Sequence, residues 1–152
     1  GFSAGGHLAS TAGTHFDYGD KLSTDSVERL SCRPDFMILM YPVISFVDSA
    51  VHSGSSKALL GENPDTELLK YYSNELQVKE DTPPAFIALA DNDTGVPAEN
   101  SLLMYKALRQ QKIPAELHII SEGGHGFGLG TENEHVGSWT NSLKLWLNWL
   151  NK

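Results

Sequence analysis

Short apolar runs alternate along the chain with longer segments in which apolar residues recur every three or four positions. The apolar runs lie at 35–42, 85–90 and 115–120. Runs of this length, bounded by prolines and polar clusters, indicate strands, and a run that is apolar almost throughout is typical of a parallel strand buried on both faces. The pattern therefore predicts a strand at each of these places.

The segments between and after these strands have the helical pattern. The segment 98–112 follows Pro97 and ends before Pro114, and prolines at these places favour the start and the end of a helix. In the segment 135–151 the apolar residues form a stripe that is typical of packing against a sheet. The stripe consists of Trp139, Leu143, Trp146 and Leu150. Further helices are predicted at 5–15, 53–60 and 65–72, with 16–33 irregular apart from a short helical turn at 26–30.

The alternation of strands and helices predicts an α/β fold. Parallel strands joined by helices take right-handed crossovers, which place helices on both faces of the sheet in a three-layer arrangement. We expect the strands to lie side by side in chain order. The chain has 152 residues, the length of one domain.

Composition removes several function classes. The net charge is −8, which argues against binding to nucleic acid or to anionic membranes. No apolar stretch reaches the roughly 20 residues that a membrane helix needs. Cys32 is the single cysteine, so an intrachain disulfide is excluded. The His, Asp and Glu residues lack the spacing of metal ligands, and we expect neither a metal nor a cofactor.

The first residues have the pattern G-x-S-x-G, with Gly1, Ser3 and Gly5 at its fixed positions. This pattern is typical of a nucleophile elbow, a tight strand-to-helix turn that presents a serine hydroxyl. We expect glycines there because a Cβ would collide with the neighbouring strand and helix. The amide of Ala4 would then form half of an oxyanion hole. The pattern is weak alone, and its alternative is a plain turn.

Candidates for the acid lie in the loop after the run at 85–90. This loop contains Asp91 and Asp93 and then reaches Pro97. Loops at the carboxyl ends of parallel strands hold the functional groups of such sheets. The alternative for either aspartate is a role in forming the turn or capping the next helix.

The candidate for the base is His125, in the loop after the run at 115–120. Glycines on both sides of a histidine allow the backbone to bend so that the imidazole projects into a cleft. The glycines of this loop are Gly123, Gly124, Gly126 and Gly128. The other histidines lack such surroundings and are interpreted as structural; they are His7, His15, His52, His118 and His135.

Three motifs in this order resemble the α/β-hydrolase superfamily. They are Gly1-Phe2-Ser3-Ala4-Gly5-Gly6, then Asp93-Thr94-Gly95-Val96-Pro97, then Gly123-Gly124-His125-Gly126-Phe127. More closely, the chain resembles the branch of acetylxylan esterases and small carboxylesterases, which are relatives of the prolyl-oligopeptidase catalytic domain. The resemblance extends from the elbow to the last helix, and the order of the motifs is far more specific than any one of them.

The resemblance implies a catalytic triad of Ser3, Asp93 and His125. In the family the acid stands four residues before the proline of its loop, which maps to Asp93, with Asp91 as the fallback. The sequence departs from the family at this loop. Asn92 stands where a second acid is usual, and Gly95 stands where a hydrophobic residue is usual.

The resemblance also implies that residues 1–152 are the C-terminal portion of one catalytic domain. The family has about five strands before the elbow and a glycine-containing loop that supplies the second oxyanion-hole amide. Without these strands, the edge of the strand at 35–42 would be open and apolar, and such an edge invites pairing. We expect a strand of the full-length protein or a second copy of the chain to cover it.

The resemblance implies hydrolysis of carboxylic esters of short acyl groups, including acetyl groups on plant polysaccharides or oligosaccharides. One alternative is a serine peptidase of the prolyl-oligopeptidase type. A second is an inactive fragment that serves only as an interaction module. The connection at 45–76 is interpreted either as a cover over the active site that contacts substrate or as a simple connector. We expect little activity from this chain alone.

Overall fold

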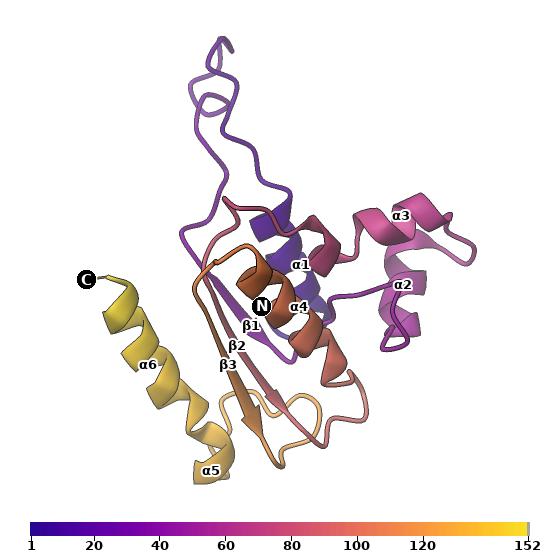
Figure 1. Ribbon diagram of the computed structural model, residues 1–152, viewed down its shortest axis with the longest axis vertical. Coiled ribbons are helices and arrows are strands. Elements are labelled where there is room, and N and C mark those ends of the chain that lie inside the picture. The colour runs from indigo at the N-terminus through magenta and orange to yellow at the C-terminus, as the bar shows by residue number, and fades with distance from the viewer. Residues whose placement is uncertain (152) are drawn as a thin grey trace.

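The computed structural model describes residues 1–151, which form a three-stranded sheet with helices packed on both faces (Figure 1). The strands are β1 (Met37–Met40), β2 (Ala85–Ala90) and β3 (Ala115–Ile120). The helices are α1 (Ala4–Thr14), α2 (Ser53–Leu60), α3 (Thr66–Tyr71), the 3₁₀ helix η1 (Asn74–Gln77), α4 (Glu99–Gln110), α5 (Glu134–Gly137) and α6 (Trp139–Leu150).

The sheet is parallel throughout, in the order β1-β2-β3 that the sequence predicts. Met40 of β1 lies opposite Ala88 of β2, and Ala90 of β2 lies opposite Ile120 of β3. Every residue of β2 is buried, as expected for a strand hydrogen-bonded on both edges and covered on both faces. The three strands therefore end at one edge of the sheet, and the loops that follow them begin close together.

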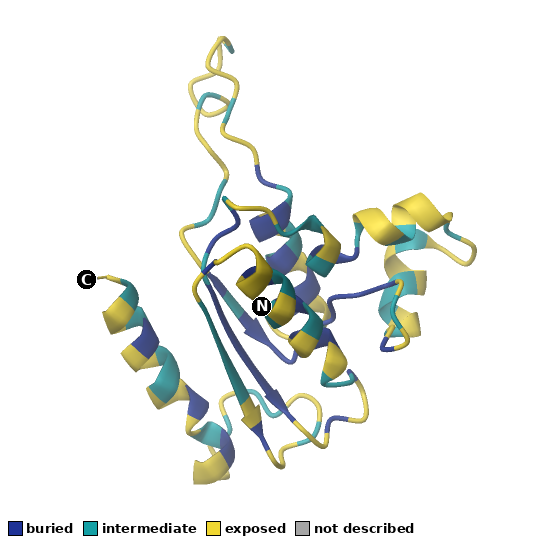
Figure 2. Cartoon of the chain, in the orientation of Figure 1, coloured by how far each residue is buried: buried dark blue, intermediate teal, exposed yellow. Residues whose placement is uncertain are grey.

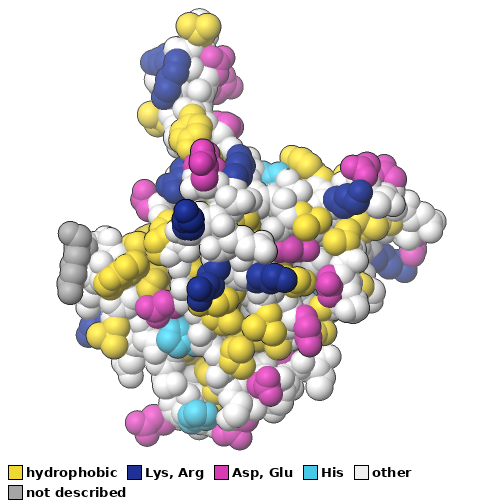
Figure 3. Space-filling view, viewed as in Figure 1, with side chains coloured by type: hydrophobic (Ala, Val, Ile, Leu, Met, Phe, Trp, Pro, Cys, Tyr) yellow, Lys and Arg dark blue, Asp and Glu magenta, His cyan; other side chains and the backbone are white. Residues whose placement is uncertain are grey.

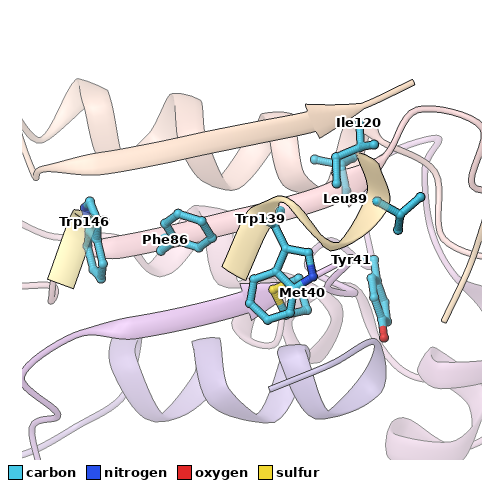
Figure 4. Close-up of a cluster of buried hydrophobic side chains, with 9 residues drawn as sticks. Met40, Tyr41, Phe86, Leu89, Ile120, Trp139 and Trp146 are labelled. Atoms are coloured by element: carbon cyan, nitrogen blue, oxygen red, sulfur yellow. The ribbon is translucent and has the colours of Figure 1, made fainter. Parts of the chain in front are cut away.

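Two apolar layers hold the helices on the sheet. On one face α6 packs Trp139 and Trp146 against Met40, Phe86 and the other residues of a cluster that Figure 4 shows at close range. On the opposite face α1 and α4 cover a second cluster, built from the alternate residues of the strands and from Met104 and Leu108. Figure 2 shows the buried residues concentrated in β1, in β2 and on the inner faces of the helices.

The helix predicted at 135–151 is interrupted at Ser138 and forms α5 and α6. The Asn133 side chain caps α5 by accepting the backbone N–H groups of His135 and Val136. Ser138 keeps helical dihedral angles, φ −58° and ψ −23°, so the break lies in the hydrogen bonding and not in the direction of the chain. The predicted stripe persists because Trp139 and Trp146 stay on the buried face.

The connection after β1 is anchored to α1 by a buried asparagine that sequence reasoning did not single out. The Asn74 amide in η1 donates to Ser10 Oγ at 2.7 Å and to the carbonyl oxygen of His7 at 3.2 Å. Its oxygen accepts from Thr14 Oγ1 at 3.3 Å. A buried amide with all its groups bonded fixes one geometry, so η1 is held on the helix that begins at the elbow.

The segment 17–33 projects from the body of the protein (Figure 1). It contains no helix beyond turns, one of which spans 26–29 where a helical turn was predicted. Acidic and basic side chains gather on it (Figure 3), and Leu22 and Val27 are exposed. Cys32 is an exposed free thiol at its base.

The edge of β1 is less open than the sequence suggested. Gly1 donates to the carbonyl oxygen of Ile38 at 2.7 Å and accepts from the amide of Met40 at 2.9 Å. The amide of Ser3 donates to the carbonyl oxygen of Met40 at 2.9 Å. Residues 1–3 thus supply the end of the strand that enters the elbow, and they cover β1 at its carboxyl end. Association of copies through this edge stays a prediction.

Within residues 1–151 no helix has the length and apolar character needed to cross a membrane.

Glu75, in η1, is a half-buried residue whose carboxylate oxygen Oε2 is fully buried. Burial raises its pKa above the usual value, the charge of Asp48 acts in the same direction, and a hydrogen bond with Ser45 opposes both. Oε2 has no hydrogen-bond partner among residues 1–151. Because the folded state binds this proton more tightly than the unfolded chain does, the resulting stability is present at low pH. It is lost as the pH rises through the folded-state pKa.

We expect Glu75→Gln to raise the urea midpoint of unfolding at pH 7, because the variant buries no charge. The difference should vanish near pH 3, where the carboxyl is protonated in both states. Glu80→Gln, at an exposed glutamate, is the control and should change little at either pH. A Glu75→Gln variant that is less stable at pH 7 would contradict this reading.

Candidate active site

Ser3 lies at the turn between the strand end at residues 1–2 and α1. Its φ is 53° and its ψ is −121°, a left-handed conformation that costs a non-glycine residue about 1–3 kcal/mol and that clusters at functional sites. The conformation is held by the 2.9 Å bond from its amide to Met40 and by its carbonyl oxygen, which accepts from the amide of Val43 at 3.2 Å. The strained turn presents the side chain beyond the carboxyl edge of the sheet.

The structure brings together three side chains that stand far apart in the sequence. Ser3 Oγ lies 2.8 Å from His125 Nε2, and His125 Nδ1 lies 2.7 Å from Asp93 Oδ2. A carboxylate only accepts hydrogen bonds, so Nδ1 carries the proton and Nε2 is left as the acceptor for the serine hydroxyl. The arrangement is that of a nucleophile, a base and an orienting acid.

The Asp93 carboxylate is fully buried and doubly held. Its side chain has no exposed area, whereas that of His125 is 31% exposed. Its second oxygen, Oδ1, accepts the backbone N–H groups of Gly95 at 2.8 Å and of Val96 at 2.9 Å. These bonds fix the carboxylate so that Oδ2 points at the imidazole. Of the two candidate aspartates, the structure brings Asp93 to His125. Asp91 is exposed.

Glycines at the elbow have unequal roles, and one expectation was wrong. A Cβ at Gly1 would overlap the carbonyl oxygen of Gly5, as expected for a strand and helix in close contact. A Cβ at Gly5 itself would meet nothing within 4 Å among the described residues, whereas one at Gly6 would lie 2.7 Å from the Pro42 side chain. The close approach of α1 to the end of β1 therefore occurs at Gly6.

The acid loop leaves little space for a side chain at Gly95. A Cβ there would lie 3.0 Å from His125 Cγ and 3.4 Å from Asp93 Oδ1. The acid loop and the imidazole are packed too closely to admit a side chain without movement.

The amide of Ala4 lies at the first residue of α1. The first N–H groups of a helix have no acceptor within the helix, and the helix dipole makes this end favourable for negative charge. An oxyanion that forms beside Ser3 can therefore be stabilised by this amide.

A pocket of about 480 Å³ begins next to the elbow, between α1 and α2. It contains no Asp, Glu, Lys or Arg, and the residues that line it are Ala4, His7, Leu8, Thr11, Phe46, His52, Gly54, Ser55, Ala58, Leu59 and Tyr72. Seven of them, from Phe46 to Tyr72, come from the connection at 45–76. The connection thus lines a pocket that reaches Ala4, the residue after Ser3, and its role as a cover stays a prediction.

The polar groups of the pocket are largely turned away from it. His7 Nε2 bonds to the carbonyl oxygen of Tyr72 at 2.8 Å, and its ring stacks on Phe46 at 4.7 Å. Desolvation by burial lowers the pKa of His7, an effect that the bond to Tyr72 partly opposes, so burial favours the neutral ring. His52 Nδ1 accepts from the amide of Ser55 and caps α2. The pocket is therefore uncharged and mainly apolar.

The remaining histidines make local contacts away from Ser3. His118 Nε2 lies 3.0 Å from Glu116 Oε2, His15 Nε2 lies 3.0 Å from the carbonyl oxygen of Tyr71, and His135 is exposed at the start of α5. Within residues 1–151 no group of three or more His, Cys, Asp or Glu side chains is arranged to hold a metal ion.

Two residues that the sequence did not single out as site residues contact the loop that contains His125. Asn92 Oδ1 accepts the backbone N–H of Gly124 at 2.8 Å, and the Tyr41 hydroxyl accepts that of Gly128 at 3.2 Å. The sequence marked Asn92 only as a departure from the family, and Tyr41 only as part of a strand. Neither position carries a local signal for a contact with the histidine loop.

The chain matches one protein family and is similar to two curated proteins. The BD-FAE family matches residues 1–108, most of the chain. The chain is 41% identical over 140 residues to an endo-1,4-β-xylanase B of Butyrivibrio fibrisolvens, covering 92% of the chain and 22% of the relative. It is 36% identical over 151 residues to an acetylxylan esterase of Xylanibacter ruminicola, covering 97% of the chain and 29% of the relative.

Solved structures share the fold. An acetyl ester-xyloside bifunctional hydrolase from Caldicellulosiruptor lactoaceticus matches with a TM-score of 0.96 at 50% identity, over 99% of this chain and 55% of that protein. A carboxylesterase from Lactobacillus plantarum shares the fold with a TM-score of 0.75 at 24% identity, over 99% of this chain and 57% of that protein. The chain thus spans just over half of these structures and less than a third of the curated relatives.

Proposed function

Because the chain belongs to the BD-FAE family and has the α/β-hydrolase fold, we propose that it carries the catalytic triad of a carboxylic ester hydrolase. The observation that carries the proposal is the continuous line of hydrogen bonds from Ser3 through His125 to the buried Asp93. The catalytic domain in this proposal is larger than the chain, which contributes the portion from the elbow onward.

The reaction begins when Ser3 Oγ attacks the carbonyl carbon of the ester. His125 Nε2 takes the hydroxyl proton as general base, and the imidazolium that forms is stabilised by Asp93 through Nδ1–H. His125 then gives the proton to the leaving alcohol, and an acyl group stays on Ser3. A water molecule repeats the cycle and releases the acid, which restores the free serine.

The tetrahedral intermediates place negative charge on the former carbonyl oxygen. The Ala4 amide at the start of α1 is one donor to this oxygen, and an amide outside this chain is the second. Removing one donor of this kind costs about 2.7–4 kcal/mol of barrier. This requirement supports low activity for the chain by itself and full activity in the longer protein.

The proposed substrates are esters of short acyl groups, with acetyl groups on plant polysaccharide or oligosaccharide fragments as the leading class. An acetylxylan esterase and an acetyl ester-xyloside hydrolase among the relatives support this class. The uncharged pocket beside Ala4 is far larger than an acetyl group, so it has room for an apolar part of the substrate beyond the scissile bond. Nothing in the site favours a peptidase over an esterase.

We expect Ser3→Ala in the full-length protein to lower kcat for p-nitrophenyl acetate by at least about a thousandfold, because the variant lacks the nucleophile. The far-UV circular dichroism and the thermal midpoint should stay close to those of the parent. Ser26→Ala removes an exposed serine hydroxyl on the projecting segment and should retain turnover. Unchanged hydrolysis by Ser3→Ala would reject the proposed site and favour the interaction-module alternative.

The two candidate acids are separated by a matched pair of variants. Asp93→Asn removes the acceptor that holds the proton on His125 Nδ1, and we expect kcat to fall by about 10⁴-fold, as a wrong tautomer does in other triads. Asp91→Asn changes an exposed carboxylate and should leave kcat within about twofold. Equal losses in the two variants would contradict the assignment of Asp93.

Filling the pocket tests whether it receives substrate. Ala58→Trp places an indole among the lining residues and should raise KM for p-nitrophenyl acetate several-fold, with a smaller effect on kcat, because bound substrate loses contact area. Lys57→Trp adds the same bulk at an exposed neighbour outside the lining and should leave KM unchanged. Equal KM values in both variants would place the substrate elsewhere.

A further inference from the structure

The loop that holds His125 has a backbone with little intrinsic stiffness. Four of its glycines have positive φ angles, 138° at Gly123, 62° at Gly124, 79° at Gly126 and 56° at Gly128. Glycine populates such conformations readily and also leaves them readily. A base must be held within a fraction of an ångström of its productive position. The loop therefore needs contacts from outside itself.

The first contact comes from the acid loop. Asn92 Oδ1 accepts the amide N–H of Gly124 at 2.8 Å, immediately before His125 in the chain. Asn92 is also the immediate neighbour of Asp93, whose Oδ2 lies 2.7 Å from His125 Nδ1. One turn of chain after β2 thus holds both the ring of the histidine and the backbone beside it.

The second contact comes from the end of β1. The Tyr41 hydroxyl accepts the amide N–H of Gly128 at 3.2 Å, on the other side of His125. The Tyr41 ring lies edge-on to the imidazole at 5.1 Å and to Phe127 at 4.8 Å, and it is only 4% exposed.

Tyr41 has a strained backbone conformation. Its φ is 36°, an angle that is costly for an aromatic residue. The amide of Tyr41 is fixed by a 2.7 Å bond to the carbonyl oxygen of Ala88 in β2. The strained backbone is thus held by the sheet, and the ring is directed toward the histidine loop and not along the strand.

We propose that Asn92 and Tyr41 are positioning residues that tether the histidine loop at two points, one on each side of His125. This proposal rests on the proposed function of the triad. The two tethers lie just after different strands, β2 and β1, so together they fix the rotation of the loop as well as its distance from Ser3. Neither donates a proton to the reaction: the hydrogen bond of each residue is to the backbone of the loop, at Gly124 or Gly128, and not to Ser3 Oγ or the ring nitrogens of His125.

The test uses the full-length protein and p-nitrophenyl acetate, with Tyr41→Phe and Asn92→Leu singly and combined. Tyr41→Phe keeps the buried ring and removes one acceptor, and Asn92→Leu removes the other acceptor with little change in size. We expect each to lower kcat about tenfold, with KM within about twofold of the parent. The double variant should lose about a hundredfold or more, as a displacement of the base by about 1 Å does.

Two variants separate positioning from general stability. Asn92→Asp keeps an acceptor for Gly124 and should restore most of kcat. It should also move the lower limb of the pH profile of kcat/KM to higher pH, because the added negative charge favours the protonated imidazole. Tyr18 lies on the projecting segment, and its hydroxyl donates to Asp81. Tyr18→Phe removes this hydroxyl and should leave kcat and the pH profile unchanged.

The outcomes are distinguishable. The tethers are rejected if Ser3→Ala abolishes turnover while the double variant, folded by circular dichroism at the assay temperature, keeps kcat within twofold. They are also rejected if Asn92→Asp is no better than Asn92→Leu and leaves the pH profile in place. Turnover that survives Ser3→Ala overturns the proposed function, and the tethers with it.

Discussion

The parallel pairing of β2 between β1 and β3 is the constraint on which the rest of the structure depends. All three strands run in one direction and pair in register, so their carboxyl ends meet at one edge. The loops that carry Asp93 and His125 leave from that edge, and the elbow with Ser3 joins it through the hydrogen bonds to Met40. Residues separated by up to 122 positions meet because the sheet brings their strand ends together.

The burial of one side chain in the loop after β2 sets the electrostatics of the site. Asp91 and Asn92, the first two residues of this loop, are exposed, whereas the side chain of Asp93 has no exposed area. A buried carboxylate needs hydrogen bonds to offset its desolvation. The backbone amides of Gly95 and Val96 and the imidazole provide them, and in doing so they fix its direction.

The elements could be predicted from the sequence because each has a local cause. The apolar runs are long enough to form strands, the prolines at 97 and 114 mark the ends of α4, and the tryptophan stripe follows the helical period. The three side chains that meet at the site could be found because glycines and strand ends surround them in a recognisable order. Boundaries differ from prediction by a few residues, since end residues depend on hydrogen bonds and not on apolar pattern.

The contacts that could not be predicted join segments far apart in the chain. Asn74 reaches α1 across more than 60 positions, and Tyr41 reaches Gly128 across 87. A single asparagine or tyrosine has no periodicity to reveal such a partner. The error at Gly5 has the same origin, because whether a Cβ collides depends on which neighbour lies opposite, and Pro42 lies opposite Gly6.

The glycine content of the histidine loop follows from these constraints. The loop must turn sharply after β3 and pass so close to the acid loop that a Cβ at Gly95 would press on the imidazole. Glycines allow this path but leave the loop deformable. The stiffness must therefore come from rigid neighbours, and the ends of β1 and β2 are the rigid parts within reach. On this argument the position of the base is encoded largely outside the segment that contains it, in side chains whose local sequence gives no sign of the role.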